Sequence, residues 1–161
     1  MAYRPSRNTT LSAGLAVTDA KVVQFNAAPG AAPTAIIPAG TKLGYAPTWK
    51  GSVAFDQRFE TGSFADISFG VSMNFQSEQL SLFTPDAVQR QFGTIPAYAL
   101  VNASLSLVDK DDKWKLSLHV RNLFDKSYAA AIVNGGGSGS YRYQIPRDAD
   151  RYLGVTLRVG F

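Results

Sequence analysis

The C-terminal stretch Arg151-Tyr-Leu-Gly-Val-Thr-Leu-Arg-Val-Gly-Phe161 decides the fold class, because its side chains alternate without a break. A period of two residues is that of a β-strand whose two faces meet different surroundings. The apolar positions are Leu153, Val155, Leu157, Val159 and Phe161, and the other positions are Tyr152, Gly154, Thr156, Arg158 and Gly160. The stretch therefore predicts a strand with one apolar face and one face of small and polar residues.

Five earlier segments repeat this alternation, so the chain is predicted to be all-β. The expected strands are longer than the roughly five or six residues usual in a soluble sheet, and they suit a tilted strand that crosses a membrane. The six predicted strands lie near residues 9–22, 47–59, 63–76, 97–108, 113–125 and 150–161.

The connections between these strands alternate between short and long. Glu60-Thr61-Gly62 and Asp109-Lys-Asp-Asp112 are tight turns, whereas the links near 23–46, 77–96 and 126–149 are long. Short turns on one side and large loops on the other are typical of antiparallel up-and-down barrels in the bacterial outer membrane. Loops of this length are unusual in a compact soluble domain. We therefore expect an up-and-down transmembrane barrel segment in the outer membrane of a Gram-negative bacterium.

Alternation alone does not say which face is inside. In a soluble lipocalin-like barrel the apolar side chains point inward, and such a ligand-binding barrel remains an alternative. The polar face here combines small Ser, Gly, Thr and Asn residues with Lys and Arg, as expected of a wet lumen. Large aromatic residues near the strand ends fit two interfacial girdles on the apolar face. These aromatic residues are Trp49, Phe59, Phe75, Trp114 and Phe161.

The composition excludes several functions. The 161 residues suffice for one domain, they include no cysteine, and His119 is the single histidine, so disulfides, thiol nucleophiles and His-pair metal sites are excluded. No nucleophile–base constellation appears, so we expect no enzyme, no cofactor and no metal. Lys and Arg are scattered despite the net charge of +4, so nucleic acid is not an expected partner. The N-terminus shows no signal peptide, and an upstream segment is expected to direct export.

The stretch Asn122-Leu-Phe-Asp-Lys-Ser-Tyr128 resembles the "NLFDxxY" segment on the penultimate strand of TonB-dependent outer-membrane receptors. Pro146-Arg147 followed by 152–161 resembles the closing strand of that family. The segments 96–107 and 40–47 resemble earlier strands and loop entries in the same order. The resemblance covers nearly the whole chain, and its last forty or so residues are the most specific part.

The resemblance implies a specific architecture. Members of the family carry an N-terminal plug domain inside a 22-stranded barrel. Residues 1–161 would then be the C-terminal part of such a barrel, without the plug and without a TonB box. Six strands cannot close a transmembrane barrel, because single-chain examples begin at about eight strands and open edges in lipid leave backbone groups unpaired.

The resemblance also implies function and partners. The family takes up scarce nutrients, most commonly ferric siderophores, with energy from the TonB system. The implied partners are outer-membrane lipid, the rest of the barrel and its plug, TonB through the missing N-terminal part, and the barrel-assembly machinery. A small oligomeric pore, in which several chains complete one barrel, is a further alternative.

Candidate functional residues fall into three groups. Tyr141, Arg142 and Tyr143 in the last long loop would contact an anionic or aromatic ligand, unless they form a solvated loop tip. Phe161, at the end of an alternating strand, resembles the signal read by the barrel-assembly machinery, which β-augmentation would recognise, although an ordinary strand-end aromatic explains it too. The third group faces the lumen or plug and is expected to act as structural support, together with Asp56 and Asp66. It comprises Lys50, Arg58, Lys115, His119, Arg121 and Arg158.

Overall fold

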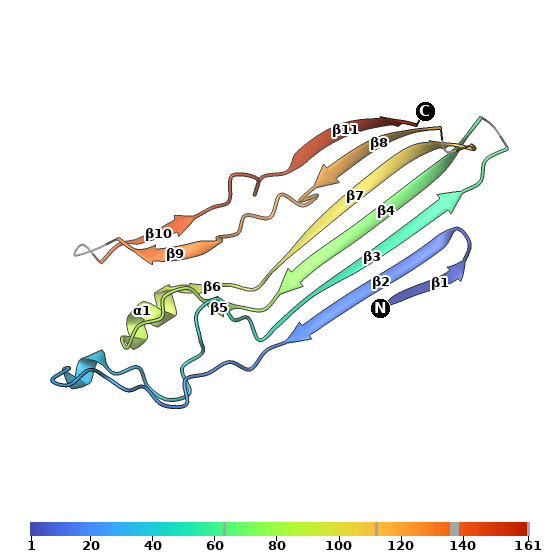
Figure 1. The fold of residues 1–161 in the computed structure, drawn as a ribbon. Helices are drawn as coiled ribbons and strands as arrows, with labels where there is room; N and C mark the ends of the chain where they lie inside the picture. The colour runs from blue at the N-terminus through green and yellow to red at the C-terminus, as the bar shows by residue number, and fades with distance from the viewer. Residues whose placement is uncertain (63, 112, 136–138, 161) are drawn as a thin grey trace.

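The computed structural model describes residues 1–62, 64–111, 113–135 and 139–160, which form a long antiparallel sheet with elaborated loops at one end (Figure 1). The sheet has seven strands in the order β1-β2-β3-β4-β7-β8-β11. The strands are β1 (Ala2–Ser6), β2 (Thr9–Val17), β3 (Trp49–Phe59), β4 (Ala65–Gln76), β7 (Tyr98–Asp109), β8 (Trp114–Arg121) and β11 (Tyr152–Val159). Each strand pairs antiparallel with its neighbours, so the predicted all-β, up-and-down fold class is confirmed.

The sheet differs from the sequence prediction at several strand ends. The structure adds β1, which pairs with β2 through Ala2↔Ser12 and Tyr3↔Leu11 and sits at one edge of the sheet. The second strand ends at Val17 rather than near residue 22. The fifth predicted strand ends at Arg121 rather than at 125, because Asn122 adopts a positive φ of 49° that an extended strand does not permit.

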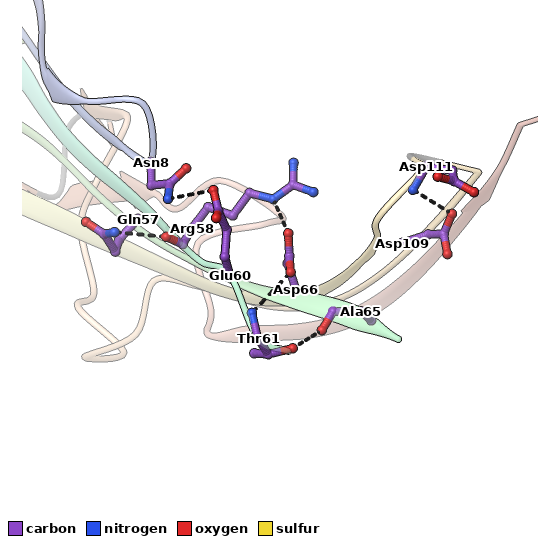
Figure 2. Close-up of polar contacts among 9 residues, drawn as sticks. All are labelled: Asn8, Gln57, Arg58, Glu60, Thr61, Ala65, Asp66, Asp109 and Asp111. Carbon is purple, nitrogen blue, oxygen red and sulfur yellow. Dashed lines mark hydrogen bonds and ion pairs between the residues drawn. The ribbon is translucent and has the colours of Figure 1, made fainter. Parts of the chain in front are cut away.

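The tight turns at the far end of the sheet are held by side chains that bond the backbone (Figure 2). At the β3–β4 turn, the buried Asp66 accepts the Nε–H of Arg58 at 3.0 Å and the backbone N–H of Thr61 at 3.2 Å. Asn8 of the β1–β2 turn donates to Glu60 at 3.0 Å, which joins two neighbouring turns. These bonds explain how short polar sequences reverse the chain without help from a packed core.

The sheet has no apolar core on its apolar face, which is uncovered. Leu15, Val17, Leu153 and Val155 of that face are 65–72% exposed. Burial varies on the polar face, where Ser106 is only 4% exposed whereas Gly14, Ser52 and Thr156 are exposed. Removing apolar surface from water stabilises a protein by roughly 25 cal/mol per Å². An exposed apolar face of this size is therefore expected to contact an apolar partner or an apolar solvent.

Most buried apolar side chains lie at the loop end of the molecule, apart from Ala65 and Val108 near the tight turns. Ile95 and Ile132 are each 1% exposed, and Leu80 is 7% exposed. The loops that carry them contain short elements, namely η1 (Pro33–Ala35), β5 (Gln79–Leu80), α1 (Ala87–Phe92), β6 (Thr94–Ile95), β9 (Ala131–Asn134) and β10 (Tyr141–Gln144). Within the described part of the chain, the helices are too short and too polar to traverse a lipid bilayer.

The helix α1 begins at a capping aspartate. The carboxylate of Asp86 accepts the backbone N–H groups of Val88 at 2.8 Å and Gln89 at 3.2 Å. These two backbone hydrogen bonds, with that from Gln89 first, lower the pKa of Asp86, because they stabilise its charged form. A side-chain cap satisfies amide groups that the first turn of a helix leaves unpaired.

We expect Asp86→Ala to increase amide hydrogen exchange across residues 87–92, because two amide groups lose their acceptor. Since the folded-state pKa lies below the ordinary value, the cap stabilises α1 above about pH 4 and is lost as the pH falls through the lowered pKa. Asp86→Asn is the matched control, because asparagine also caps helices but does not titrate in this range. An unchanged exchange rate in the alanine variant would contradict the prediction.

Candidate functional site

The three long loops, residues 18–48, 77–97 and 122–151, lie at the same end of the sheet and contact one another (Figure 1). We call this assembly the loop cap. Gly44 of the first loop forms a bridge with Leu80 of the second, and the N–H of Tyr45 donates to the carbonyl of Leu80 at 2.8 Å. The second and third loops meet through Asn134 and Gln89, whose side-chain amides are 3.3 Å apart.

The hydroxyl of Ser81 is the centre of the loop cap. It accepts the N–H of Ile132 at 2.8 Å and donates to the carbonyl of the same residue at 2.8 Å. The phenol oxygen of Tyr45 lies 2.9 Å from it, so one buried hydroxyl joins all three loops. A serine hydroxyl has one donor and two acceptor positions, and all three are used here.

The predicted ligand contacts Tyr141, Arg142 and Tyr143 lie on β10, which pairs with β9 in a small hairpin of the loop cap. Tyr141 stacks on Phe92 of α1, with ring centroids 5.3 Å apart, so its ring already packs within the protein. Arg142 and Tyr143 are exposed, and Tyr143 keeps 61% of its accessible surface. The exposed pair is therefore available to a ligand, whereas Tyr141 supports the hairpin.

The Asn122-Leu-Phe-Asp stretch forms the junction between β8 and β11. Asn122 and Asp125 both have positive φ, at 49° and 51°. The side-chain amide of Asn122 donates to the carbonyls of Ala149 at 2.6 Å and Lys126 at 3.1 Å, and its oxygen accepts the N–H of Lys126 at 2.9 Å. The carboxylate of Asp125 accepts the N–H of Arg151 at 2.9 Å. The motif thus fastens the last loop to the start of the closing strand.

The six residues predicted to face the lumen all lie on the polar face of the sheet. In one row across the strands, Asp56, Gly70, Ser104, His119 and Gly154 are successive Cα partners. The imidazole of His119 covers Gly154, where a Cβ atom would collide with Nε2. A groove of about 370 Å³ runs along this row.

The charged residues of the polar face differ in their contacts. Arg58 pairs with Asp66 at 3.0 Å beside the β3–β4 turn, which gives it a structural role. Lys50 lines a second groove of about 500 Å³ nearer to the loop cap, beside Gln76 and Tyr98. Lys115 and Arg158 are direct Cα partners on adjacent strands and are both exposed.

Phe161, predicted as the assembly signal, lies outside the described residues. The described residues include no group of three or more His, Asp or Glu side chains arranged to hold a metal ion.

Comparison with known proteins shows a likeness to a solved structure. No protein-family model matches the sequence, and no curated protein matches it. Among solved structures, the chain superposes on the ferric yersiniabactin uptake receptor FyuA from Yersinia pestis with a TM-score of 0.73 and 16% sequence identity. The match covers 99% of this chain and 22% of the receptor. The likeness shows the fold. The chain spans about a fifth of the length of that receptor, so nothing of the receptor's activity transfers directly.

Proposed function

We propose that this chain is the C-terminal part of the barrel of a TonB-dependent outer-membrane receptor that takes up a scarce nutrient, with ferric siderophores as the expected cargo class. One observation carries the proposal: an uncovered apolar sheet face is combined with a fold that superposes on part of an uptake receptor. Lipid would cover the apolar face. The exposed Leu153 and Val155 speak against the soluble barrel, in which the apolar face would be enclosed.

The open edges of the sheet support the same proposal. β1 and β11 end the strand order, and no described strand pairs with their outer edges. An unpaired strand edge in lipid costs several kcal/mol for each unsatisfied group. The remaining barrel strands would pair with these edges, and the plug would occupy the space over the polar face. TonB would act on that plug, which belongs to the proposed full-length receptor and not to residues 1–161.

The proposal predicts uptake by the full-length gene product that carries this chain. Expressed in a Gram-negative host lacking its own siderophore receptors, it should fractionate with the outer membrane and import radioiron from at least one of a panel of ferric siderophores. Import should disappear in a tonB-deficient host. Residues 1–161 alone, reconstituted in liposomes, should give no substrate-specific flux.

Two results would overturn the proposal. Purification of the full-length product as a detergent-free soluble monomer would favour the ligand-binding barrel. Single-channel conductance by residues 1–161, with a fixed number of chains per channel, would favour the oligomeric pore, which the open edges of β1 and β11 would also permit.

A further inference from the structure

Basic residues outnumber acidic residues on the polar face of the six long strands. The basic residues are Lys50, Arg58, Lys115, Arg121 and Arg158, and the acidic residues are Asp56 and Asp66. One acidic residue, Asp66, is already held by Arg58 at 3.0 Å. The excess of positive charge is concentrated on β8 and β11, which carry three of the five basic residues and neither aspartate.

Two of these cations face each other directly. Lys115 of β8 and Arg158 of β11 are Cα partners on the same face of the sheet. Side chains in such a pair stand about 5 Å apart at Cβ, and like charges placed this way destabilise a sheet. Among the described residues, neither cation forms an ion pair with a carboxylate, so the sheet itself does not relieve the repulsion.

A neighbouring barrel strand beyond β11 would reach Arg158 but not Lys115. β8 is an inner strand, and the two residues beside Lys115 in its row are Val108 of β7 and Arg158 of β11. The nearest carboxylate along the row, Asp66, is two strands away, at about 10 Å for a strand spacing of about 4.8 Å. No carboxylate of the described strands therefore stands beside Lys115 in its row, and a group above the polar face would reach it directly.

We infer that the polar face of β8 and β11, centred on Lys115 and Arg158, is the docking surface for an acidic protein segment that lies in the lumen. Its carboxylates would sit between the two cations and convert their repulsion into two ion pairs. The inference rests on the proposed function, which places a plug over this face, and adds that the plug presents Asp or Glu to these two strands. Charge complementarity selects this occupant, because an apolar or basic segment would leave the two cations uncompensated.

A zero-length carbodiimide cross-linker tests the inference, since it joins a lysine amine to a carboxylate only when the two are in contact. The reaction would be run on the full-length gene product in outer membranes, followed by proteolysis and mass spectrometry. Lys113 and Asp111, 3.0 Å apart in the β7–β8 turn, provide an internal positive control. We expect a cross-link from Lys115 to an Asp or Glu outside the barrel wall, and its loss in Lys115→Gln.

A variant in which the two charges are reversed provides a second test, with protease cleavage as the measurement. Lys115→Glu with Arg158→Glu should increase protease cleavage of the lumenal segment, because carboxylates would then face carboxylates. Lys110→Glu, an exposed substitution in the adjacent turn with the same change of charge per residue, should not. Formation of the Lys113–Asp111 cross-link without any cross-link from Lys115, or a cross-link from Lys115 only to the barrel wall, overturns the inference.

The two proposals fail separately. Outer-membrane fractionation and radioiron uptake, measured on the same membranes, report the proposed function. Active uptake without the Lys115 cross-link would reject the docking surface and leave the receptor assignment intact. A Lys115 cross-link to an acidic segment in a protein that imports no ferric siderophore would support the docking surface and reject that cargo.

Discussion

Replacing Asn122 with alanine should open the junction between β8 and β11. The substitution removes the partners of three backbone groups, the carbonyls of Ala149 and Lys126 and the N–H of Lys126. Asn122 is only 5% exposed, so these groups would lose their partners in a largely buried place, at about 1–3 kcal/mol each. Alanine at a φ of 49° adds about 1–2 kcal/mol of backbone strain. We expect a total of at least about 4 kcal/mol.

This loss corresponds to a fall of close to a thousandfold in amide exchange protection, at about 1.4 kcal/mol per factor of ten. Hydrogen exchange of residues 123–128 and 149–152 measures it directly. Asn122→Gly is the matched control, because glycine accepts the positive φ and loses only the side-chain bonds. The glycine variant should therefore be affected less than the alanine variant. Equal protection in parent and alanine variant would refute the role assigned to this residue.

Removing the hydroxyl of Ser81 should weaken the contacts among the three loops of the loop cap. Ser81→Ala leaves the buried N–H and C=O of Ile132 without their partner, and the hydroxyl of Tyr45 loses its hydrogen bond to the second loop. With about 1–3 kcal/mol for each unsatisfied buried group, the cost is at least about 2 kcal/mol. Amide protection in 131–134 and 79–81 should fall about thirtyfold.

Ser106→Ala is the control for the loop-cap experiment. Ser106 is also a buried serine, but its hydroxyl pairs with Ser117 within the sheet at 2.9 Å. Its substitution should leave exchange in the loop cap unchanged. Tyr45→Phe, which removes only one of the three bonds at Ser81, should give a smaller loss of about 1 kcal/mol. A loop cap that stays protected in Ser81→Ala would show that apolar packing around Ile95 and Ile132 is sufficient to hold it.

The long strands were readable from the sequence because their alternation is physically enforced. Leu153, Val155 and Leu157 must lie on the same face of the sheet. A shift of the strand register by one residue would move every side chain to the opposite face. β1 was missed because its five residues, with Pro5 among them, show no such pattern. The short elements β9, β10 and α1 were missed for a related reason, since four to six residues are too few to display a period.

The candidate surfaces were only partly readable. The alternation of side chains along each strand predicts that Lys115 and Arg158 lie on the same face. Only the register between β8 and β11 shows that the two residues are direct partners. The Asn122-Leu-Phe-Asp stretch was noticed through a resemblance, yet the positive φ angles that explain Asn122 and Asp125 follow from contacts with residues more than twenty positions later. Ser81 carried no signal at all, because its role depends on loops that are distant in the sequence.

The loop cap has an immunological consequence. Its outer surface is assembled from three segments that meet only in the folded protein, around a hydroxyl that none of them could satisfy alone. An antibody raised against the second or the third loop as a synthetic peptide would see a chain with Leu80 or Ile132 exposed, whereas the native protein buries both. Sera raised against the folded protein should therefore bind discontinuous epitopes in the loop cap and lose their binding on denatured blots.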